Sequence, residues 1–295
     1  MLSKPHHRLA GIGAFALSGV IAATAFFTWI SQESLSDMAV RLPGKDGRPA
    51  TVRTEEGPVD FTGVFQTFDG TPATLPGTWP RFRGANFDNI AAEAPTLADS
   101  WGPDGPPVLW TTDLGSGYAG PVVHDGRVYV LDYDEETRSD ALRCFSLEDG
   151  KEIWRHSYKI EVVRNHGMSR TVPAVADGYV VSIGPRCHVL CLDAQTGALQ
   201  WGIDLQREYE TEEPLWYTGQ CPLIDNGQVI LAPGAPDALL MAVALDTGEV
   251  VWKTPNPMGW QMSHSSIMPM TVAGRRMYVY TAVGGVVGIA TDGED

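Results

Sequence analysis

Side chains that could bind a ligand occur in four short segments, each a few residues before a proline that opens an apolar run. The segments read GSGYAG (115–120), RNHGMSR (164–170), LWYTGQ (215–220) and QMSHSS (261–266). Their aromatic, guanidinium, imidazole and amide groups belong to Tyr118, Arg164, His166, Arg170, Trp216, Tyr217, Gln220 and His264. Guanidinium groups bind carboxylates, and a flat aromatic ring can stack on a ligand. These residues are ligand-binding candidates, although the same set would also serve to hydrate a surface rim.

Metal chemistry has little support in the sequence. Cys187, His188 and Cys191 have ligand-like spacing, but on a strand His188 points away from the two thiols, so the three groups cannot meet at one ion. We predict no metal site. Four cysteines in an exported chain would suit disulfides. However, Cys144 and Cys191 both stand six residues before a turn glycine, which favours a small buried residue at a repeated position.

Other catalytic classes are disfavoured by motif and charge. The sequence has no Gly-x-Ser-x-Gly, phosphate-loop or His-Glu-x-x-His motif. Its net charge of −15 repels phosphate backbones, so we expect no nucleic-acid partner. The acidic stretches at 135–136 and 208–213 are interpreted as solvated loops.

The N-terminus predicts export. Leu9 to Ile30 is a run of 22 residues without a charge, preceded by Lys4 and Arg8. As a helix this run would be about 33 Å long, enough to cross a bilayer core of about 30 Å. Residues 1–30 are thus expected to be a signal anchor that places the rest in the periplasm or another extracytoplasmic space. A cleavable signal peptide ending near Ala25 is the alternative.

Two phrases repeat with a period of about 48 residues, which indicates a repeat architecture. The first is an apolar run followed by a glycine at which the chain is expected to turn back. These glycines are Gly126, Gly178, Gly227 and Gly274, spaced 52, 49 and 47 residues apart. The second ends in tryptophan, at Trp110, Trp154, Trp201 and Trp252, spaced 44, 47 and 51 residues apart. The last three tryptophans each follow a turn glycine by four residues, at Gly150, Gly197 and Gly248.

Each period holds apolar and alternating runs for four short antiparallel strands, and no long amphipathic helix follows residue 30. Units too small to bury their own faces are expected to stack radially as the blades of a β-propeller. The recurring tryptophan would then dock one blade on the next. The segments quoted first precede the innermost strands, so their side chains would converge at one mouth of the central channel.

The repeats resemble a known family. CLDAQTGALQW (191–201) and ALDTGEVVW (244–252) are similar to the tryptophan-docking motif of propellers with pyrroloquinoline-quinone (PQQ) repeats. WPRFRGANFDN (79–89) resembles the segment that opens the propeller in PQQ-binding-like members. The family includes quinoprotein alcohol and glucose dehydrogenases and the non-enzymatic propellers of outer-membrane assembly. The resemblance implies an all-β propeller over residues 79–295. Residues 31–78 have scattered Pro and Gly and no repeat phrase, so we expect them to be a linker.

The resemblance also implies an incomplete ring. About four blades are present where the family usually has seven or eight, and the last unit stops inside a blade, as a fragment would. Val108 to Trp110 reads as an outer strand without preceding partners. We therefore expect residues 31–295 alone to be aggregation-prone.

Function remains divided between two classes. The first expectation is a membrane-anchored, non-catalytic binding or scaffold module for envelope proteins or a small ligand, without a cofactor. The alternative is a PQQ-dependent dehydrogenase that oxidises alcohols or sugars with PQQ and calcium. That role would need carboxylates for calcium and for a base, and the closest are Glu210, Glu212 and Glu213. Departures from the family weaken both roles, since neither a lipid-attachment cysteine nor a vicinal cysteine pair is present.

Overall fold

The computed structural model describes residues 6–31, 57–91, 97–162 and 168–291. The chain divides into two compact units, Met1–Arg48 and Pro49–Asp295. The first unit contains one helix, α1 (His6–Ser31), which confirms the helix expected at Leu9 to Ile30. Within the described residues, no helix combines the length and the apolar composition needed to cross a bilayer.

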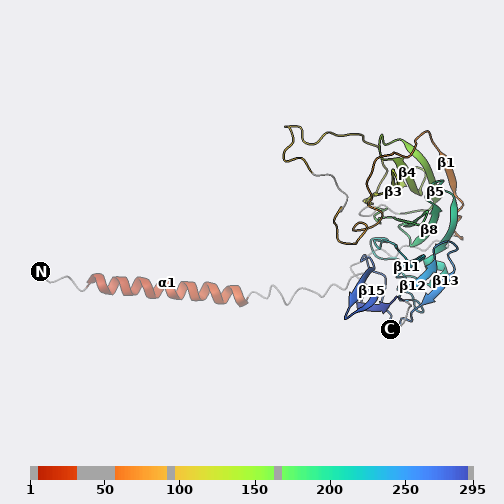
Figure 1. Cartoon of the computed structure of the whole chain (residues 1–295). Coiled ribbons are helices and arrows are strands. Elements are labelled where there is room, and N and C mark those ends of the chain that lie inside the picture. Colours follow the sequence, from red (N-terminus) through yellow and green to blue (C-terminus); the bar gives the residue numbers. More distant parts are fainter. Residues whose placement is uncertain (1–5, 32–56, 92–96, 163–167, 292–295) are drawn as a thin grey trace. The chain divides into compact units, whose positions relative to one another are not determined.

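The second unit contains four antiparallel sheets that follow one another in chain order (Figure 1). They have the strand order of propeller blades, and we call them blades 1 to 4. Blade 1 contains β2 (Val122–His124), β3 (Arg127–Asp134), β4 (Ser139–Ser146) and β5 (Glu152–Lys159). Blade 2 contains β6 (Ala174–Ala176), β7 (Tyr179–Ile183), β8 (His188–Asp193) and β9 (Leu199–Asp204), and a short helix, α2 (Leu205–Tyr209), follows it.

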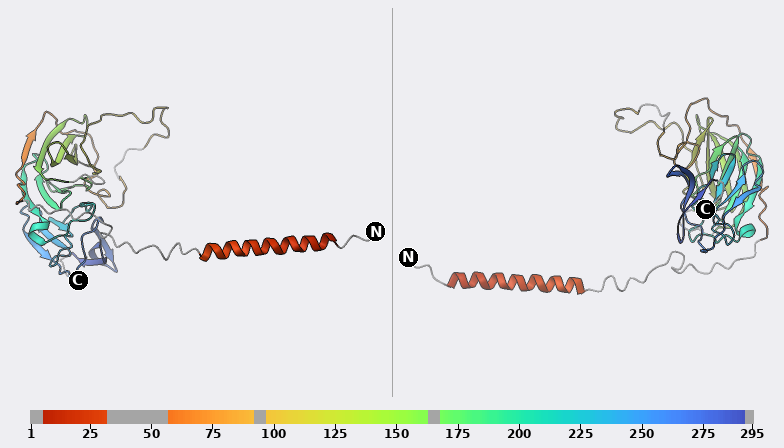
Figure 2. Two further views of the ribbon diagram at one scale, coloured as in Figure 1. Left: turned by 180° about the vertical axis from the view of Figure 1, so that it is seen from behind. Right: turned by 60° about the horizontal axis from the view of Figure 1, so that its bottom comes forward.

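Blade 3 contains β10 (Leu223–Asp225), β11 (Gln228–Leu231), β12 (Met241–Ala244) and β13 (Val250–Lys253). Blade 4 contains β14 (Met268–Val272), β15 (Arg275–Ala282) and β16 (Gly285–Ala290). Successive blades lie face to face (Figure 2), and apolar clusters fill the layers between them. The repeat prediction is therefore confirmed as four stacked sheets, while a closed ring is not shown.

The first repeated glycine marks a tight hairpin in every blade. Asp125 and Gly126 have φ values of 49° and 69°, and the same pair of positive values recurs at the first hairpin of blades 2, 3 and 4. Two consecutive positive φ angles define a type I′ turn, whose twist matches that of the flanking strands. Glycine at the second position avoids the steric cost that a side chain would meet there.

Three of the repeated tryptophans, Trp110, Trp154 and Trp201, pack against turn glycines of the blade that follows them. A Cβ atom added to Gly150 would lie 2.5 Å from the Trp110 ring, and one added to Gly248 would lie 2.8 Å from Trp201. The indole N–H groups of Trp110 and Trp201 donate to the carbonyl oxygens of Leu147 and Leu245, at 3.0 and 2.9 Å. The indole and the turn thus form one joint between blades.

Trp154 fits the same joint with one difference. It is 1% exposed and lies against Gly197, but its indole N–H has no hydrogen-bond partner among the described residues. The equivalent carbonyl, that of Ala194, accepts a hydrogen bond from the Tyr129 hydroxyl at 2.9 Å. Trp252 stacks on Tyr278 instead, and the matching turn of blade 4 lies outside the described residues.

Part of the segment expected to be a linker forms a strand. β1 (Val64–Thr67) pairs antiparallel with β5 and adds a fifth strand to blade 1. All four of its residues are exposed, so its sequence carries no alternating apolar pattern that would have revealed it. Val108 to Trp110, expected as an outer strand, form no strand in the structure, although Trp110 docks as described.

The motif WPRFRGANFDN ties the blades together along their inner strands. Trp79 exchanges two backbone hydrogen bonds with Val123 of β2, at 2.7 and 3.0 Å. The carbonyl oxygen of Pro80 accepts from the amide of Val175 in β6 at 2.8 Å. The Arg81 guanidinium donates to the carbonyl oxygen of Ile224 in β10 at 3.2 Å. One short segment thereby pairs with backbone groups of the innermost strands in three successive blades. Without this segment, those groups at the inner strand edges would lack a partner in the fold.

Candidate functional site

The four loops that precede the innermost strands, here called the rim loops, contact one another in order. Tyr118 donates its amide to the carbonyl oxygen of Ser169 at 2.7 Å, which joins the first loop to the second. The amide of Val172 contacts the Cys221 sulfur at 3.3 Å, and the amide of Cys221 donates to the Ser266 hydroxyl at 3.1 Å. The described parts of the loops therefore form one continuous surface.

Three predicted ligand residues lie near one another on this surface. Tyr118 is 75% exposed, and the Arg170 charge acts on both Tyr118 and His264. Partial burial lowers the pKa of His264, and the nearby Arg170 lowers it further. The His264 ring also contacts the carbonyl oxygen of Tyr217 through Nε2 at 2.9 Å. This group presents a cation, a phenol and an imidazole that favours its neutral form.

Two other predicted ligand residues are buried. Tyr217 is 4% exposed within an apolar cluster that includes Tyr133 and Tyr158. Gln220 is fully buried: its Oε1 accepts from the amide of Ala232 at 2.9 Å, and its Nε2 donates to the carbonyl oxygen of Ala232 at 3.1 Å. Trp216 is half-buried in the same loop, while Arg164 and His166 lie outside the described residues.

Replacing Gln220 by leucine is expected to destabilise the chain by about 1–3 kcal/mol, because both buried backbone groups of Ala232 lose their partner. Urea denaturation followed by tryptophan fluorescence measures the change in unfolding free energy. Gln195→Leu, at an exposed turn position, is the control and should change it little. Unchanged stability in Gln220→Leu would return Gln220 to the set of ligand candidates.

A buried chain of polar side chains crosses the interface between blades 1 and 2. The Ser169 hydroxyl donates to Asp140 at 2.6 Å, and the Tyr158 hydroxyl lies 3.4 Å from the same carboxyl group. Tyr158 also contacts Nδ1 of His188 at 3.2 Å, and Nε2 of His188 lies 3.9 Å from Asp204, the N-cap of α2. All five side chains belong to residues that are at most 7% exposed.

Burial sets the protonation of this chain. It raises the pKa of Asp140 to about 7, although the hydrogen bonds from Ser169 and Tyr158 oppose the rise. The Asp132 carboxylate adds to the rise. Burial lowers the pKa of His188 to about 4, against the attraction of Asp204. The folded state therefore favours a protonated Asp140 and a neutral His188 in mildly acidic solution.

These shifts predict a pH-dependent stability. The folded pKa of Asp140 exceeds its unfolded value of about 4, so its stabilising contribution is full below pH 4 and is lost as the pH rises through about 7. The lowered pKa of His188 has the opposite effect on stability, which falls as the pH falls. Its stabilising contribution is complete above the unfolded pKa of about 6.5, so it does not change in the range tested. As the pH rises from 6.5 to 8, the unfolding free energy of Asp140→Asn should therefore increase relative to that of the unmodified chain.

Urea denaturation at pH 6.5 and pH 8 measures this gain. Asp134→Asn is the matched control, since turn hydrogen bonds hold the pKa of that exposed carboxyl below its usual value and it stays ionised throughout. Equal pH profiles for Asp140→Asn and the unmodified chain would show that Asp140 does not titrate in this range.

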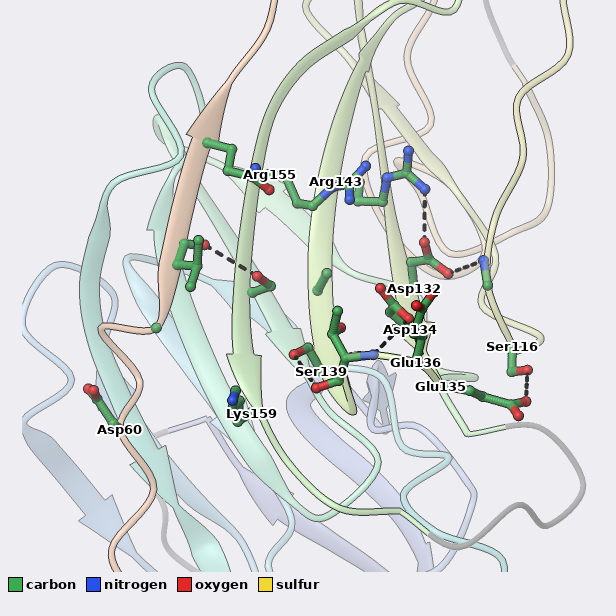
Figure 3. Close-up of a pocket in the computed structure, with 17 residues that line it drawn as sticks. Asp60, Ser116, Asp132, Asp134, Glu135, Glu136, Ser139, Arg143, Arg155 and Lys159 are labelled. Atoms are coloured by element: carbon green, nitrogen blue, oxygen red, sulfur yellow. Dashed lines mark hydrogen bonds and ion pairs between the residues drawn. The ribbon is translucent and has the colours of Figure 1, made fainter.

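A pocket of about 810 Å³ lies on the face of blade 1 that is turned away from blade 2 (Figure 3). Small residues at positions such as Ser139, Ala141 and Ser157 leave space between β1, β4 and β5. Acidic residues border it on the turn after β3, and Lys159 borders it on β5. None of the predicted ligand residues lines this pocket, and its acidic turn at 135–136 was predicted to be a solvated loop.

An ion-pair network stiffens one wall of the pocket. Arg143 bonds Asp132 at 2.8 Å and Glu152 at 2.9 Å, and Glu152 also binds Arg155 at 2.7 Å. Hydrogen bonds from both arginines hold the pKa of Glu152 below its usual value despite burial. Since these charges neutralise one another, the network holds β3, β4 and β5 in register rather than presenting free charge.

Comparison with known proteins identifies the family. The family model described as outer membrane protein assembly factor BamB, of the PQQ-repeat type, matches residues 138–295, more than half of the chain. The chain belongs to this PQQ-repeat family.

Three relatives of this PQQ-repeat chain have curated descriptions. The serine/threonine-protein kinase AfsK of Streptomyces griseus is 31% identical over 57% of the chain and 19% of its own length. The quinoprotein alcohol dehydrogenase PedH of Pseudomonas putida is 26% identical over 46% of the chain and 22% of its own length. The assembly factor BamB of Burkholderia pseudomallei is 28% identical over 50% of the chain and 34% of its own length. The chain spans about a third or less of the length of these relatives.

Solved structures of similar fold include both kinds of relative. The quinohemoprotein alcohol dehydrogenase of Comamonas testosteroni has a TM-score of 0.43 at 18% identity, over 61% of this chain and 34% of its own. BamB of Moraxella catarrhalis has a TM-score of 0.37 at 14% identity, over 63% of this chain and 54% of its own.

The described rim loops fit PQQ and calcium only in part. Arg170 and Trp216 could hold a carboxylate and stack on a quinone, but Tyr217 and Gln220 are buried in contacts within the fold. Among the described residues, no group of three or more His, Cys, Asp or Glu side chains is placed to hold a metal ion. The four cysteines are buried and unpaired, which for Cys144 and Cys191 is the expected burial of a small strand residue, and burial raises the pKa of each thiol.

Proposed function

We propose that this PQQ-repeat chain is a non-catalytic binding or scaffold module of the cell envelope, and that its partner docks on the rim-loop surface. The supporting observation is how the rim loops use their polar side chains. Gln220 holds the backbone of Ala232, His264 contacts the backbone of Tyr217, and Ser266 accepts from the backbone of Cys221. Groups that brace loops in this way build a firm docking surface, whereas acid–base catalysis needs side chains free to reach a reacting atom.

Location in the envelope is part of this proposal. It rests on the uncharged run from Leu9 to Ile30 and on the positive charges before it. The described apolar side chains of α1, such as Phe15 and Trp29, are 84% and 70% exposed, so they are available to a lipid or protein environment. Similarity to an outer membrane assembly factor supports envelope proteins as the class of partner.

Photo-crosslinking in living cells tests the docking surface. A photoreactive phenylalanine analogue at Tyr118, which is 75% exposed in the first rim loop, is expected to form a discrete protein adduct. The same group at Gln195, exposed on the turn between β8 and β9, is the matched control. Adducts of equal yield at both positions, or none at Tyr118, would contradict a partner at the rim loops.

A PQQ-dependent dehydrogenase is the second candidate, favoured by the proximity of Arg170 to Tyr118 and His264 and by the similarity to PedH. Adding PQQ and Ca²⁺ to the full chain tests it through quinone absorbance and dye-linked oxidation of alcohols or sugars. If this role holds, activity appears and Arg170→Ala weakens cofactor binding. Absence of both signals would eliminate it and leave the binding module.

A further inference from the structure

A segment that precedes the first blade crosses the outer edges of blades 1 and 2. This segment, residues 58–68 and here called the strap, includes β1, which pairs with β5 of blade 1. Two of its rings reach blade 2 instead. A Cβ atom added to Gly202 would lie 2.6 Å from the Phe61 ring, and one added to Gly197 would lie 2.9 Å from the Phe65 ring. The strap therefore holds both blades from outside, and glycines on blade 2 make room for its rings.

Phe61 of the strap lies against two buried imidazoles. Nε2 of His156 on β5 is 2.9 Å from the carbonyl oxygen of Phe61. The ring of His188 on β8 meets the Phe61 ring edge to face, with the ring centroids 5.4 Å apart. Both histidines are 2% exposed, whereas Phe61 is half-buried. One residue of the strap thus contacts both imidazoles and is itself in contact with solvent.

Neither imidazole has an acceptor for a second proton. Because a carbonyl oxygen only accepts, Nε2 of His156 carries the proton of the neutral ring, and a second proton would sit on Nδ1. That atom is buried and has no hydrogen-bond partner among the described residues. In His188, Nδ1 contacts the Tyr158 hydroxyl at 3.2 Å, and Nε2 lies 3.9 Å from Asp204, beyond hydrogen-bond distance. A charged imidazole would therefore bury an N–H group without a good partner, which is unfavourable.

The charged groups around His188 act in opposite directions. Asp204 of β9 attracts a proton to this ring, and Arg186, in the turn before β8, repels one. Tyr158 of β5 also contacts the Asp140 carboxyl group of β4, which burial keeps largely protonated in mildly acidic solution. Burial outweighs the attraction of Asp204 and lowers the pKa of His188 to about 4. The neutral form of this ring is therefore the one that the closed strap favours.

The surroundings of His156 favour its neutral form as well. Burial lowers the pKa of His156, and the hydrogen bond to the Phe61 carbonyl opposes this only in part. The strap contributes one titratable group, Asp60, which is exposed and bonded to Thr62 within the strap. Both imidazoles beneath Phe61 thus resist protonation for the same reason, which is their separation from water.

We propose that the strap is an acid-sensitive clamp on the joint between blades 1 and 2, closed while His156 and His188 are neutral and lifted when they take up protons. Lifting Phe61 lets water reach both rings and solvate their charge. Because both pKa values are lower in the closed state than in the open one, the clamp is strongest above about pH 6.5 and weakens as the pH falls. The open clamp frees the backbone groups of β5 that now pair with β1.

Hydrogen–deuterium exchange of the full chain in mild detergent tests this clamp. Exchange is followed at pH 7 and pH 5, with times corrected for the effect of pH on unprotected amides. Peptides from residues 57–70 report on the strap, whose Phe68 and Gly70 amides donate to carbonyl oxygens of β5 and of the residue next to them. Peptides from β11 and β12 in blade 3 report on the rest of the fold.

Protection of the strap is expected to fall about twentyfold between pH 7 and pH 5, while protection of β11 and β12 stays the same. This factor follows from His188 alone, with a pKa of about 4 under the closed strap and about 6.5 in water. Phe61→Ala uncovers both imidazoles, so its strap should be poorly protected already at pH 7.

Histidine-to-glutamine variants identify the groups that titrate. The double variant His156→Gln/His188→Gln cannot take up these protons, so its strap should be equally protected at pH 7 and pH 5. His124→Gln, at a half-buried imidazole on β2, is the matched control and should keep the loss of protection. Each single variant at 156 or 188 should reduce the loss, which provides the same comparison if the double variant is unstable.

Three outcomes would overturn the clamp. The first is equal protection of the strap at pH 7 and pH 5 in the unmodified chain. The second is a pH-dependent loss that persists in the glutamine variants at 156 and 188. The third is a parallel loss in β11 and β12, which would indicate general unfolding in acid rather than release of the strap.

Discussion

Replacing Trp154 by alanine is expected to lower the free energy of unfolding by about 3–5 kcal/mol. The indole is 1% exposed, lies in the apolar layer between blades 1 and 2, and packs against the Gly197 turn. Truncation leaves a cavity at the centre of a joint whose backbone cannot easily collapse, because β-strands hold both sides. Urea denaturation followed by circular dichroism measures the loss.

Two comparisons separate this joint from a general effect of losing a tryptophan. Trp101→Ala, at a residue that is 52% exposed, should cost far less. Trp154→Phe should cost less than Trp201→Phe, since only Trp201 loses a hydrogen bond to a carbonyl oxygen. Equal losses for Trp154→Ala and Trp101→Ala would show that Trp154 does not join the blades.

Gly197→Ala should have the second large effect, a loss of about 2–5 kcal/mol from steric overlap and backbone strain together. Its φ is 74°, a region that L residues rarely adopt, and an added Cβ would lie 2.6 Å from the Trp154 ring. The ring is held by both blades, so it cannot move away without opening the layer. Thermal melting and urea denaturation should both report the loss.

Gly178→Ala isolates the contribution of the indole. Gly178 has a comparable φ of 85°, but a Cβ added there meets nothing within 4 Å. It should therefore show only the backbone strain, about 1–2 kcal/mol. If the two alanine variants lose the same stability, the contact between turn and tryptophan carries no energy of its own.

Most of the fold could be predicted from the sequence because its signals are local and recur. A type I′ turn needs a residue that tolerates positive φ, and the glycines at 126, 178, 227 and 274 mark all four first hairpins. The tryptophan phrase predicted only that each tryptophan packs against the neighbouring blade, and the structure shows that Trp154 does so at the Gly197 turn. β1 escaped prediction because it occurs once and buries no side chain.

The candidate site was less predictable. The rim loops contact one another in the structure, but their role as a ligand site stays a prediction, because the role of each side chain depends on partners distant in sequence. Gln220 looks like a ligand residue until the backbone of Ala232 is seen against it. The pocket beside blade 1 went unnoticed because its walls come from β1, the turn after β3 and β5.

The sequence by itself determined the repeat, the hairpins and the joints between blades, because these follow from backbone geometry and side-chain spacing within one unit. Tertiary structure alone decided which polar groups are buried together. Ser169, Asp140, Tyr158 and His188 form one hydrogen-bonded chain, which ends 3.9 Å from Asp204, only because two blades stack face to face. Burial then shifts the pKa values of Asp140, Tyr158 and His188, since desolvation depends on everything packed around a group and not on its neighbours in sequence.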